Sequence, residues 1–126
     1  MWSPEQRQIT YSQTGTESEA WSLLHEVSHG LLEHKTYHSD IELLQKEVEA
    51  WERAVHLSTL YNIAIDQGFV ENCLDSYRDW LHKRSICPAC HLQGIQKDPN
   101  TYSCLNCGKT WNVTKERFCR PYRRLQ

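Results

Sequence analysis

The sequence of 126 residues lacks any long run of apolar residues. A helix that crosses a bilayer needs roughly 20 predominantly apolar residues in a row, so we expect no membrane span. The opening residues MWSPEQRQIT also lack the charged segment and apolar stretch that are typical of a secretory signal peptide. No internal repeat and no low-complexity tract is present, which argues against a repeat architecture. We therefore expect a cytoplasmic protein, and in that compartment paired cysteines more often bind metal than form disulfides.

Charge is divided unevenly along the chain. Residues 1–82 carry five Lys and Arg against fourteen Asp and Glu, a net charge of −9. Residues 83–126 carry nine Lys and Arg against two acidic residues, a net charge of +7. The change falls in the segment HKRSICPAC, where the first CxxC motif begins. We therefore predict a helical domain over residues 1–84 and a zinc ribbon with a basic tail over residues 85–126.

The spacing of apolar and capping residues predicts an α+β protein that is mainly α. A short strand is expected within RQITYSQ, followed by a helix that begins near Glu17 and ends near His34 or Lys35. Ser39 and Glu42 have capping-box spacing and predict the start of a second helix. Its expected buried stripe comprises Ile41, Leu44, Val48, Trp51 and Val55.

The second helix is expected to run as far as Gln67, with Gly68 as its stop, although it could be broken once. A third helix is expected over FVENCLDSYRDWLHK, and its expected apolar face comprises Val70, Cys73, Leu74, Tyr77 and Leu81. The expected fold is therefore one or more short N-terminal strands, three helices, and a small zinc-ribbon module of short strands and turns.

The first helix contains the motif HExxH, as His25-Glu26-Val27-Ser28-His29. Residues four apart lie on one face of a helix, so both imidazoles can reach one metal ion. The flanking residues are apolar, which favours burial of the pair, and a buried imidazole needs a partner. We predict a zinc site at His25 and His29, with Glu26 as the catalytic base.

The third zinc ligand is not decided by the motif alone. The pattern HExxHxxGxxH needs glycine at position 33 and histidine at position 35, whereas this chain has Glu33 and Lys35. His34 and His38 remain candidates but lie where the helix should end. The next helix offers Glu42, Glu47, Glu49 and Glu52. At about 100° per residue, Glu47 and Glu52 flank the expected buried stripe, and Glu49 points furthest from it.

The segments LLHEVSHGLLEH and KEVEAWERA resemble the ImmA/IrrE family of small HExxH metallopeptidases. The resemblance covers about residues 8–57, and the family pattern is HExxHxLLxH followed by E-x-E-A-[D/N]-x-F-A. It implies that Glu47 is the third zinc ligand. It also implies action on a repressor or other regulatory protein. This chain has Trp51 where the family has an Asp or Asn that helps to orient a zinc-binding histidine.

Peptide hydrolysis at such a site also needs a group that stabilises the oxyanion. Candidates are Tyr37, His38, His56 and Tyr61, and the sequence does not choose between them.

The second half of the chain contains two CxxC motifs, CPAC and CLNC, which contribute Cys87, Cys90, Cys104 and Cys107. Thirteen residues separate the two pairs, which is zinc-ribbon spacing. Four thiolates close a tetrahedral site, so this zinc is predicted to be structural. Gly108 is expected to give the second motif its turn, and His91 holds the equivalent place in the first.

The surroundings of the ribbon are basic and aromatic. Such a mixture suits nucleic acid, through phosphate contacts and base stacking, or docking onto the chain's own acidic half. The basic and aromatic residues of this region are Lys109, Trp111, Lys115, Arg117, Phe118, Arg120, Tyr122, Arg123 and Arg124.

Two functions remain open at this stage. The first is a zinc metallopeptidase with one catalytic and one structural Zn²⁺, whose ribbon recruits a protein or nucleic-acid partner. The alternative is a nucleic-acid- or protein-binding adaptor with an inactive HExxH site. The SprT-like proteases also join HExxH to a ribbon, but they use a third histidine that has no well-placed counterpart here.

Overall fold

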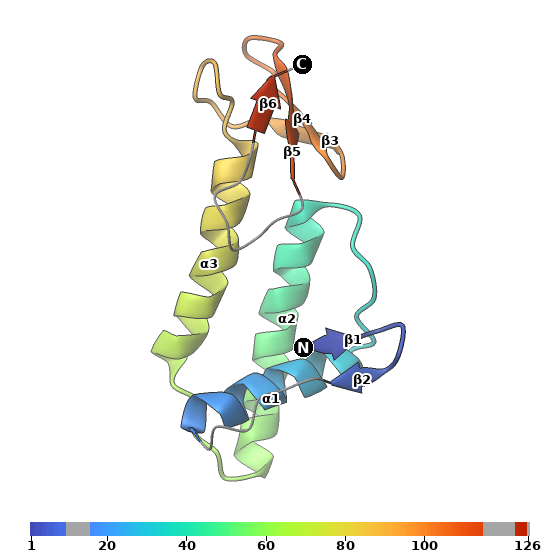
Figure 1. The fold of residues 1–126 in the computed structure, drawn as a ribbon. Coiled ribbons are helices and arrows are strands. Elements are labelled where there is room, and N and C mark those ends of the chain that lie inside the picture. The colour runs from blue at the N-terminus through green and yellow to red at the C-terminus, as the bar shows by residue number, and fades with distance from the viewer. Residues whose placement is uncertain (10–15, 115–122, 126) are drawn as a thin grey trace. The chain divides into compact units, whose positions relative to one another are not determined.

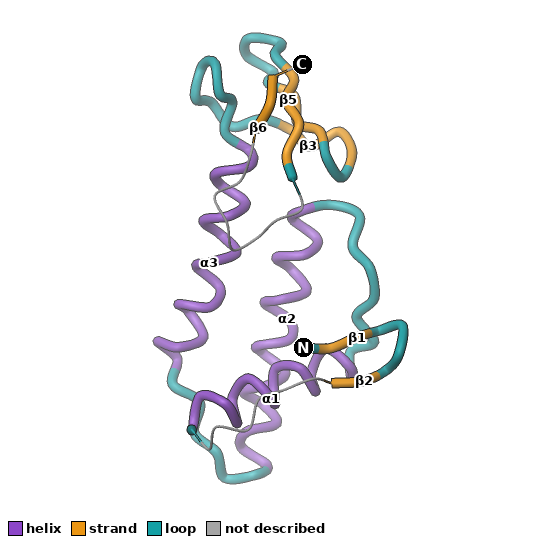
Figure 2. Tube along the Cα trace, viewed as in Figure 1, coloured by secondary structure: helices purple, strands orange, loops and turns teal. Residues whose placement is uncertain are grey.

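The computed structural model describes residues 1–9, 16–114 and 123–125 (Figure 1). It confirms a small, mainly α protein with short antiparallel strands. The elements in chain order are β1 (Trp2–Ser3), β2 (Gln8–Ile9), α1 (Glu17–Leu31), α2 (Asp40–Leu60), α3 (Gln67–Ser85), β3 (Ile95–Asp98), β4 (Thr101–Ser103), β5 (Thr110–Val113) and β6 (Arg123–Leu125). Figure 2 shows the helices in purple and the strands in orange along the chain.

Helix α1 begins at Glu17 as expected, with Thr16 in the extended conformation of an N-cap. The Thr16 side chain makes no capping hydrogen bond in this position. The expected end near His34 or Lys35 is wrong, because the helix stops at Leu31 and Glu33 takes a positive φ of 56°. The chain therefore turns back sharply just before His34.

The first turn of α2 is capped as the spacing predicted. The Ser39 hydroxyl accepts a hydrogen bond from the backbone N–H of Glu42 at 3.1 Å. The expected buried stripe is wrong at its first member, because Ile41 is 59% exposed. The buried face instead comprises Asp40, Glu47, Ala50, Trp51, Ala54, Leu57 and Ser58. This face lies about 100° from the expected stripe and places Glu47 near its centre.

The break between α2 and α3 also differs from the expectation. Helix α2 ends at Leu60, seven residues before Gln67, and Asn62 adopts a positive φ of 55°. Gly68 does not stop a helix. It lies in the first turn of α3, where its N–H donates to the Asp66 side chain at 3.0 Å. An aspartate that accepts from such an N–H satisfies a donor that has no partner within the helix.

The strands β1 and β2 form a two-residue antiparallel ladder with Trp2 opposite Ile9. The strand expected within RQITYSQ is only partly tested, because residues 10–13 lie outside the described residues. The Trp2 ring covers α1 at Gly30, where an added Cβ would lie 3.2 Å from the ring. The Trp2 Nε1–H donates to the carbonyl oxygen of His34 at 3.0 Å.

The ribbon is a four-stranded antiparallel sheet in the order β3-β4-β5-β6. In its register Tyr102 pairs with Trp111, and the two rings stack with centroids 5.8 Å apart. The core of this module comprises Cys87, Tyr102, Cys104, Trp111 and Val113. Two of these five core residues, Cys87 and Cys104, are predicted metal ligands, so part of the four-cysteine group belongs to the core.

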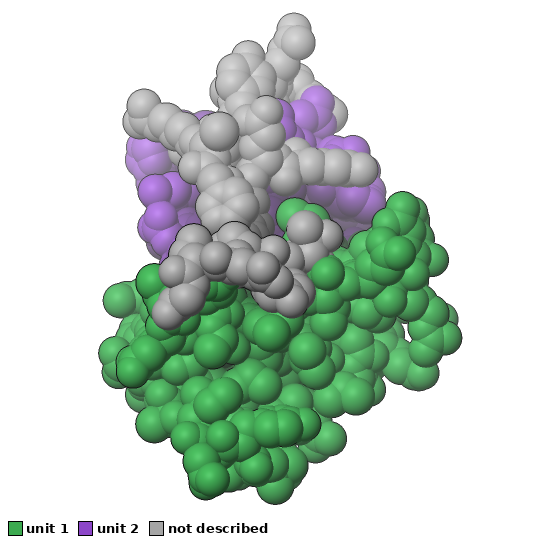
Figure 3. Space-filling model, turned by 60° about the horizontal axis from the view of Figure 1, so that its bottom comes forward, with its two compact units in different colours: residues 1–37, 45–72 green, residues 38–44, 73–126 purple. Residues whose placement is uncertain are grey.

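The chain forms two compact units (Figure 3). One comprises residues 1–37 and 45–72, and the other comprises residues 38–44 and 73–126. In the second unit, Arg84 Nε donates to Asp40 Oδ2 at 2.9 Å, and the Tyr102 hydroxyl donates to the same oxygen. All three side chains are buried. The units do not coincide with the expected segments 1–84 and 85–126, which remain a prediction about separately folding domains.

Within the described part of the chain, the helices are too short or too polar to span a bilayer.

Candidate metal centres

The two histidines of the HExxH motif lie one turn apart on α1 and are both buried. Their Nε2 atoms are 3.1 Å apart, and the rings meet edge to face. The helix supplies this geometry through its period, since residues four apart share a face. The motif therefore presents two ring nitrogens to one point.

Glu47 on α2 completes a group of three. Its Oε2 lies 2.9 Å from His25 Nε2, and its Oε1 lies 3.1 Å from His29 Nε2. The side chain is buried, and His25, His29 and Glu47 form one of the two metal-donor groups in the described residues. Glu52, the other candidate from helix geometry, is exposed. The structure thus brings Glu47 to the histidines.

The distances fit a tetrahedral ion with an open position. Zinc bonds to nitrogen and carboxylate oxygen of about 2.0–2.2 Å place neighbouring ligand atoms roughly 3.3 Å apart, close to the 2.9–3.1 Å found here. Glu47 Oε2 is buried and forms no well-directed hydrogen bond although His25 Nε2 lies nearby. Lone pairs that all point at one centre produce this geometry, so a His₂Glu donor set fits a metal at this place.

The charges in this group reinforce each other. Burial alone would raise the pKa of Glu47, but short polar contacts and charge interactions with His25 and His29 lower it to about 2. Burial alone would lower the pKa of His25, but its contacts with Glu26 and Glu47 raise it. Without metal, the group therefore favours a protonated His25 beside an ionised Glu47.

Glu26 lies beside the group without joining it. Its Oε1 is 3.5 Å from His25 Nδ1, and its side chain is 20% exposed. Burial opposes ionisation of this carboxyl, but the His25 hydrogen bond and charge outweigh that effect and lower the pKa of Glu26. An ionised, partly exposed carboxylate next to a metal-donor group can accept a proton.

Trp51 places an aromatic ring where the family that the sequence resembles has Asp or Asn. It stacks on His25 with centroids 4.3 Å apart and an interplanar angle of 9°. Phe69 packs edge-on against Trp51 and also against Trp21. The aromatic residues therefore fix the plane of the His25 ring by packing rather than by a hydrogen bond.

His34, a candidate for the third ligand, lies outside the group of His25, His29 and Glu47. It is buried, and its Nδ1 lies 2.9 Å from His29 Nδ1. Its Nε2 lies 3.1 Å from Glu49 Oε2. His34 therefore approaches the far side of His29 rather than the metal position, and Glu49 reaches His34 rather than the metal. The helix end at Leu31 was the missing information, because only the turn after it brings His34 back.

The four oxyanion candidates, Tyr37, His38, His56 and Tyr61, are all exposed. A role for any of them stays a prediction.

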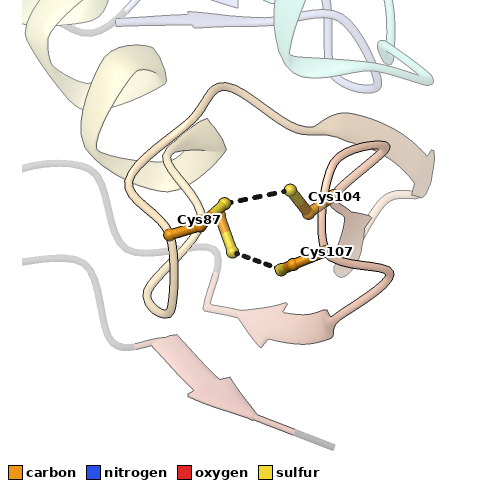
Figure 4. Close-up of side chains that lie close together, drawn as sticks. Cys87, Cys104 and Cys107 are labelled. Carbon is orange, nitrogen blue, oxygen red and sulfur yellow. Dashed lines mark hydrogen bonds between the residues drawn. The ribbon is translucent and has the colours of Figure 1, made fainter.

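The second metal-donor group comprises Cys87, Cys90, Cys104 and Cys107. The sulfur atoms of the two motifs face each other, with Cys87 Sγ 3.6 Å from Cys107 Sγ and Cys90 Sγ 3.4 Å from Cys104 Sγ (Figure 4). Zinc–sulfur bonds of about 2.3 Å require sulfur atoms roughly 3.8 Å apart, so the cluster fits a four-thiolate ion.

The two CxxC turns have the same backbone design. The N–H of His91 donates to Cys87 O at 2.9 Å, and the N–H of Gly108 donates to Cys104 O at 3.0 Å. His91 and Gly108 both adopt a positive φ, of 62° and 74°. The predicted equivalence of these two positions is confirmed.

The backbone also acts on the thiols. Burial alone would raise the pKa of Cys87, but backbone N–H groups of Cys90 and Ala89 lower it. Backbone N–H groups of Cys107 and Asn106 lower the pKa of Cys104 in the same way. A lowered thiol pKa favours the thiolate, which is the form that binds metal.

The expected aromatic surface of the ribbon is wrong at Trp111. This side chain is fully buried, and its Nε1–H donates to the carbonyl oxygen of Arg84 at 2.9 Å. Lys109 is exposed. The side chains of the basic tail after Thr114 lie outside the described residues.

No protein-family model, no curated protein and no solved structure matches this chain. The resemblance to the ImmA/IrrE family therefore stays an expectation that rests on the quoted motifs.

Proposed function

We propose that this protein is a zinc-dependent peptidase whose site comprises His25, His29, Glu47 and Glu26. The observation that carries the proposal is the convergence of three buried donor atoms from α1 and α2, beside an ionised glutamate. A zinc ion held there would supply Lewis acidity toward a substrate carbonyl and toward water. Three protein ligands leave a coordination position open, which is typical of catalytic rather than structural zinc.

Different residues of the site bind the metal, orient a ligand and transfer the proton. His25, His29 and Glu47 bind the metal, and Trp51 holds the ring plane of His25. Glu26 is placed to take a proton from the attacking water at its carboxylate and to deliver it to the amine that leaves. Its pKa lies below the ordinary value of 4.5, so Glu26 is ionised at neutral pH, as a base must be.

The test is hydrolysis of a peptide library by the zinc-loaded chain, read by mass spectrometry. We expect the wild type to cut a subset of peptides, and Glu26→Gln to lose at least about 100-fold of that activity with its zinc content unchanged. Cleavage that is equal in the wild type and Glu26→Gln, or absent from both, would contradict the proposal. The adaptor function with an inactive site would then move ahead.

For the ribbon we propose recruitment of a protein. Leu92, Ile95 and Leu105 are 51%, 44% and 75% exposed, whereas Trp111 is buried and cannot stack on a base. Exposed apolar side chains of this size favour a protein surface over a nucleic acid. Leu105→Ser should raise KM for a protein substrate and leave kcat unchanged. Tight, salt-dependent binding of single-stranded DNA that Leu105→Ser does not alter would favour the nucleic-acid partner instead.

A further inference from the structure

The side of His29 that faces away from the metal position is occupied by a chain of polar groups. His29 Nδ1 lies 2.9 Å from His34 Nδ1, and His34 Nε2 lies 3.1 Å from Glu49 Oε2. His29 and His34 are buried, whereas the Glu49 side chain is 58% exposed. The three groups therefore connect a buried metal ligand to the protein surface.

Counting donors and acceptors fixes the direction of these hydrogen bonds. A histidine that binds metal through Nε2 in its neutral form carries its proton on Nδ1. The His29 Nδ1–H then needs an acceptor, which His34 Nδ1 provides. A neutral His34 that accepts at Nδ1 carries its proton on Nε2, and this N–H donates to the Glu49 carboxylate.

The opposite arrangement is unfavourable. If His34 carried its proton on Nδ1, its Nε2 lone pair would face the carboxylate of Glu49 at 3.1 Å, so two acceptors would meet. His29 would then carry its proton on Nε2, which points at Glu47 Oε1 in the place of the metal.

The position of His34 is fixed by the fold and not by Glu49 alone. Its backbone N–H donates to His29 O at 3.0 Å, and its carbonyl accepts from Trp2 Nε1–H at 3.0 Å. The β1 strand and the end of α1 therefore hold the imidazole against His29. A ring held in this way can select a tautomer without a large loss of side-chain freedom.

We propose that His34 and Glu49 are positioning residues that set the tautomer of His29, so that its Nε2 lone pair is directed to the metal. This inference rests on the proposed function of the same site. In the family that the sequence resembles, the residue at position 51 helps to orient a zinc-binding histidine. Here we assign that task to the pair of His34 and Glu49. Hydrogen-bonded partners of metal ligands typically contribute about 10- to 100-fold to metal affinity.

The first measurement is the Zn(II) affinity of the helical site, obtained by competition with a chelator on the full chain. We expect Glu49→Ala to weaken affinity about 10-fold. Glu49→Gln keeps an acceptor oxygen and should retain most of the affinity. Glu52→Ala is the matched control, because it removes the same charge from an exposed position of α2 and should bind Zn(II) like the wild type.

The second measurement is the ring tautomer of His29, read from ¹⁵N chemical shifts of the histidine ring nitrogens. We expect the Nδ1–H tautomer in the Zn(II)-bound wild type. Without metal, Glu47 Oε1 near His29 Nε2 favours the other tautomer, so we expect a mixture in which the Nδ1–H share is larger in the wild type than in Glu49→Ala. A purely structural role of Glu49 would change stability without changing these shifts.

The outcomes separate the two proposals. If the wild type binds Zn(II) at the cysteine cluster alone, the proposed function fails and this inference fails with it. The wild type could instead bind a second Zn(II) while Glu49→Ala keeps the wild-type Zn(II) affinity and the wild-type His29 tautomer. That result would overturn only the proposed role of His34 and Glu49.

Discussion

The two metal-donor groups hold their ligands in different ways. The cysteine cluster lies in two short turns, and backbone N–H groups act on the thiols. The His25, His29 and Glu47 group lies on two helices, and the side chains of Trp51, His34 and Glu49 surround it. A helix has no spare backbone donors in its interior, because each N–H already binds a carbonyl four residues back. The support of a helical site must therefore come from side chains.

This difference has a functional meaning. Backbone support survives most substitutions, so the ribbon depends on its cysteines and its turns. Side-chain support can be changed one residue at a time, so the affinity of the helical site can be tuned without altering the fold. Substitutions outside the ligands should therefore alter metal affinity at the three-ligand group more readily than at the four-sulfur group.

The largest expected effect comes from breaking the closed site. Cys104→Ser should remove the ribbon metal and unfold the sheet, because a structural zinc contributes on the order of 10 kcal/mol to folding at neutral pH. The measurement is zinc content together with amide NMR of residues 95–113. Cys73→Ser, outside the cluster, is the control and should keep a folded ribbon. A well-dispersed ribbon spectrum from Cys104→Ser would contradict the prediction.

Removing a ligand from the open site should have a more local effect. Glu47→Ala should lower zinc content from two ions per chain to one and leave the ribbon loaded, because one of three ligands is lost. Elemental analysis under matched conditions measures this, with Glu52→Ala as the control that keeps two. One zinc per chain in both the wild type and Glu47→Ala would mean that only the cysteine cluster binds metal, and it would contradict the prediction.

A smaller effect distinguishes the two CxxC turns from each other. At Gly108 an added Cβ meets no atom within 4 Å, so Gly108→Ala should cost only the backbone strain of its positive φ, about 1 kcal/mol. His91→Gly should have the opposite sign, since His91 already bears that strain. Thermal unfolding of the zinc-loaded protein measures both. Destabilisation by His91→Gly as well as by Gly108→Ala would contradict the prediction that His91 bears backbone strain.

The smallest effect is a pH dependence of the metal-free helical site. The pKa of His25 is raised above 6.5, so its contribution to stability is fully present below pH 6.5 and is lost as pH rises through the higher folded value. Glu47, with its pKa lowered from 4.5 to about 2, contributes above pH 4.5 and loses that contribution as pH falls toward 2.

The measurement is unfolding of the chelator-treated chain at pH 5.5 and pH 8, for the wild type and His25→Gln. The wild-type advantage over His25→Gln should be larger at pH 5.5. His82→Gln, at an exposed position of α3, should show no such difference. An advantage that grows toward pH 8 would mean that His25 is neutral without metal.

Local signals predicted the parts of the structure that depend on neighbouring residues. The spacing of Thr16 and Glu19 predicted the start of α1 near Glu17, although Thr16 makes no capping hydrogen bond, and the equivalence of His91 and Gly108 follows from motif spacing. The cysteine cluster was predictable because short turns present both sulfurs of a CxxC pair on one side.

The sequence was less informative where burial depends on distant contacts. Ile41 fits the helical period of the expected stripe, yet it is exposed while the polar residues Glu47 and Ser58 are buried. Helix α2 buries a polar metal donor, Glu47. The hydrophobic pattern of the sequence therefore does not identify its buried face. The place of His34 depends on an early helix end and on the hydrogen bond from Trp2, which no local pattern specifies.

The buried pair of Arg84 and Asp40 limits how this chain can be recombined. Arg84 also donates to the backbone oxygen of Thr114, so one guanidinium joins the start of α2 to the residue that follows β5. A segment that begins at residue 85 lacks both charges, and one that begins at residue 73 leaves Arg84 buried without its carboxylate. Breaking a buried pair in this way typically costs about 3–5 kcal/mol. Transfer of the ribbon alone to another protein by gene fusion should therefore destabilise it. Its compact unit includes the first turn of α2, which contains Asp40 and lies 44 residues before Arg84 in the sequence.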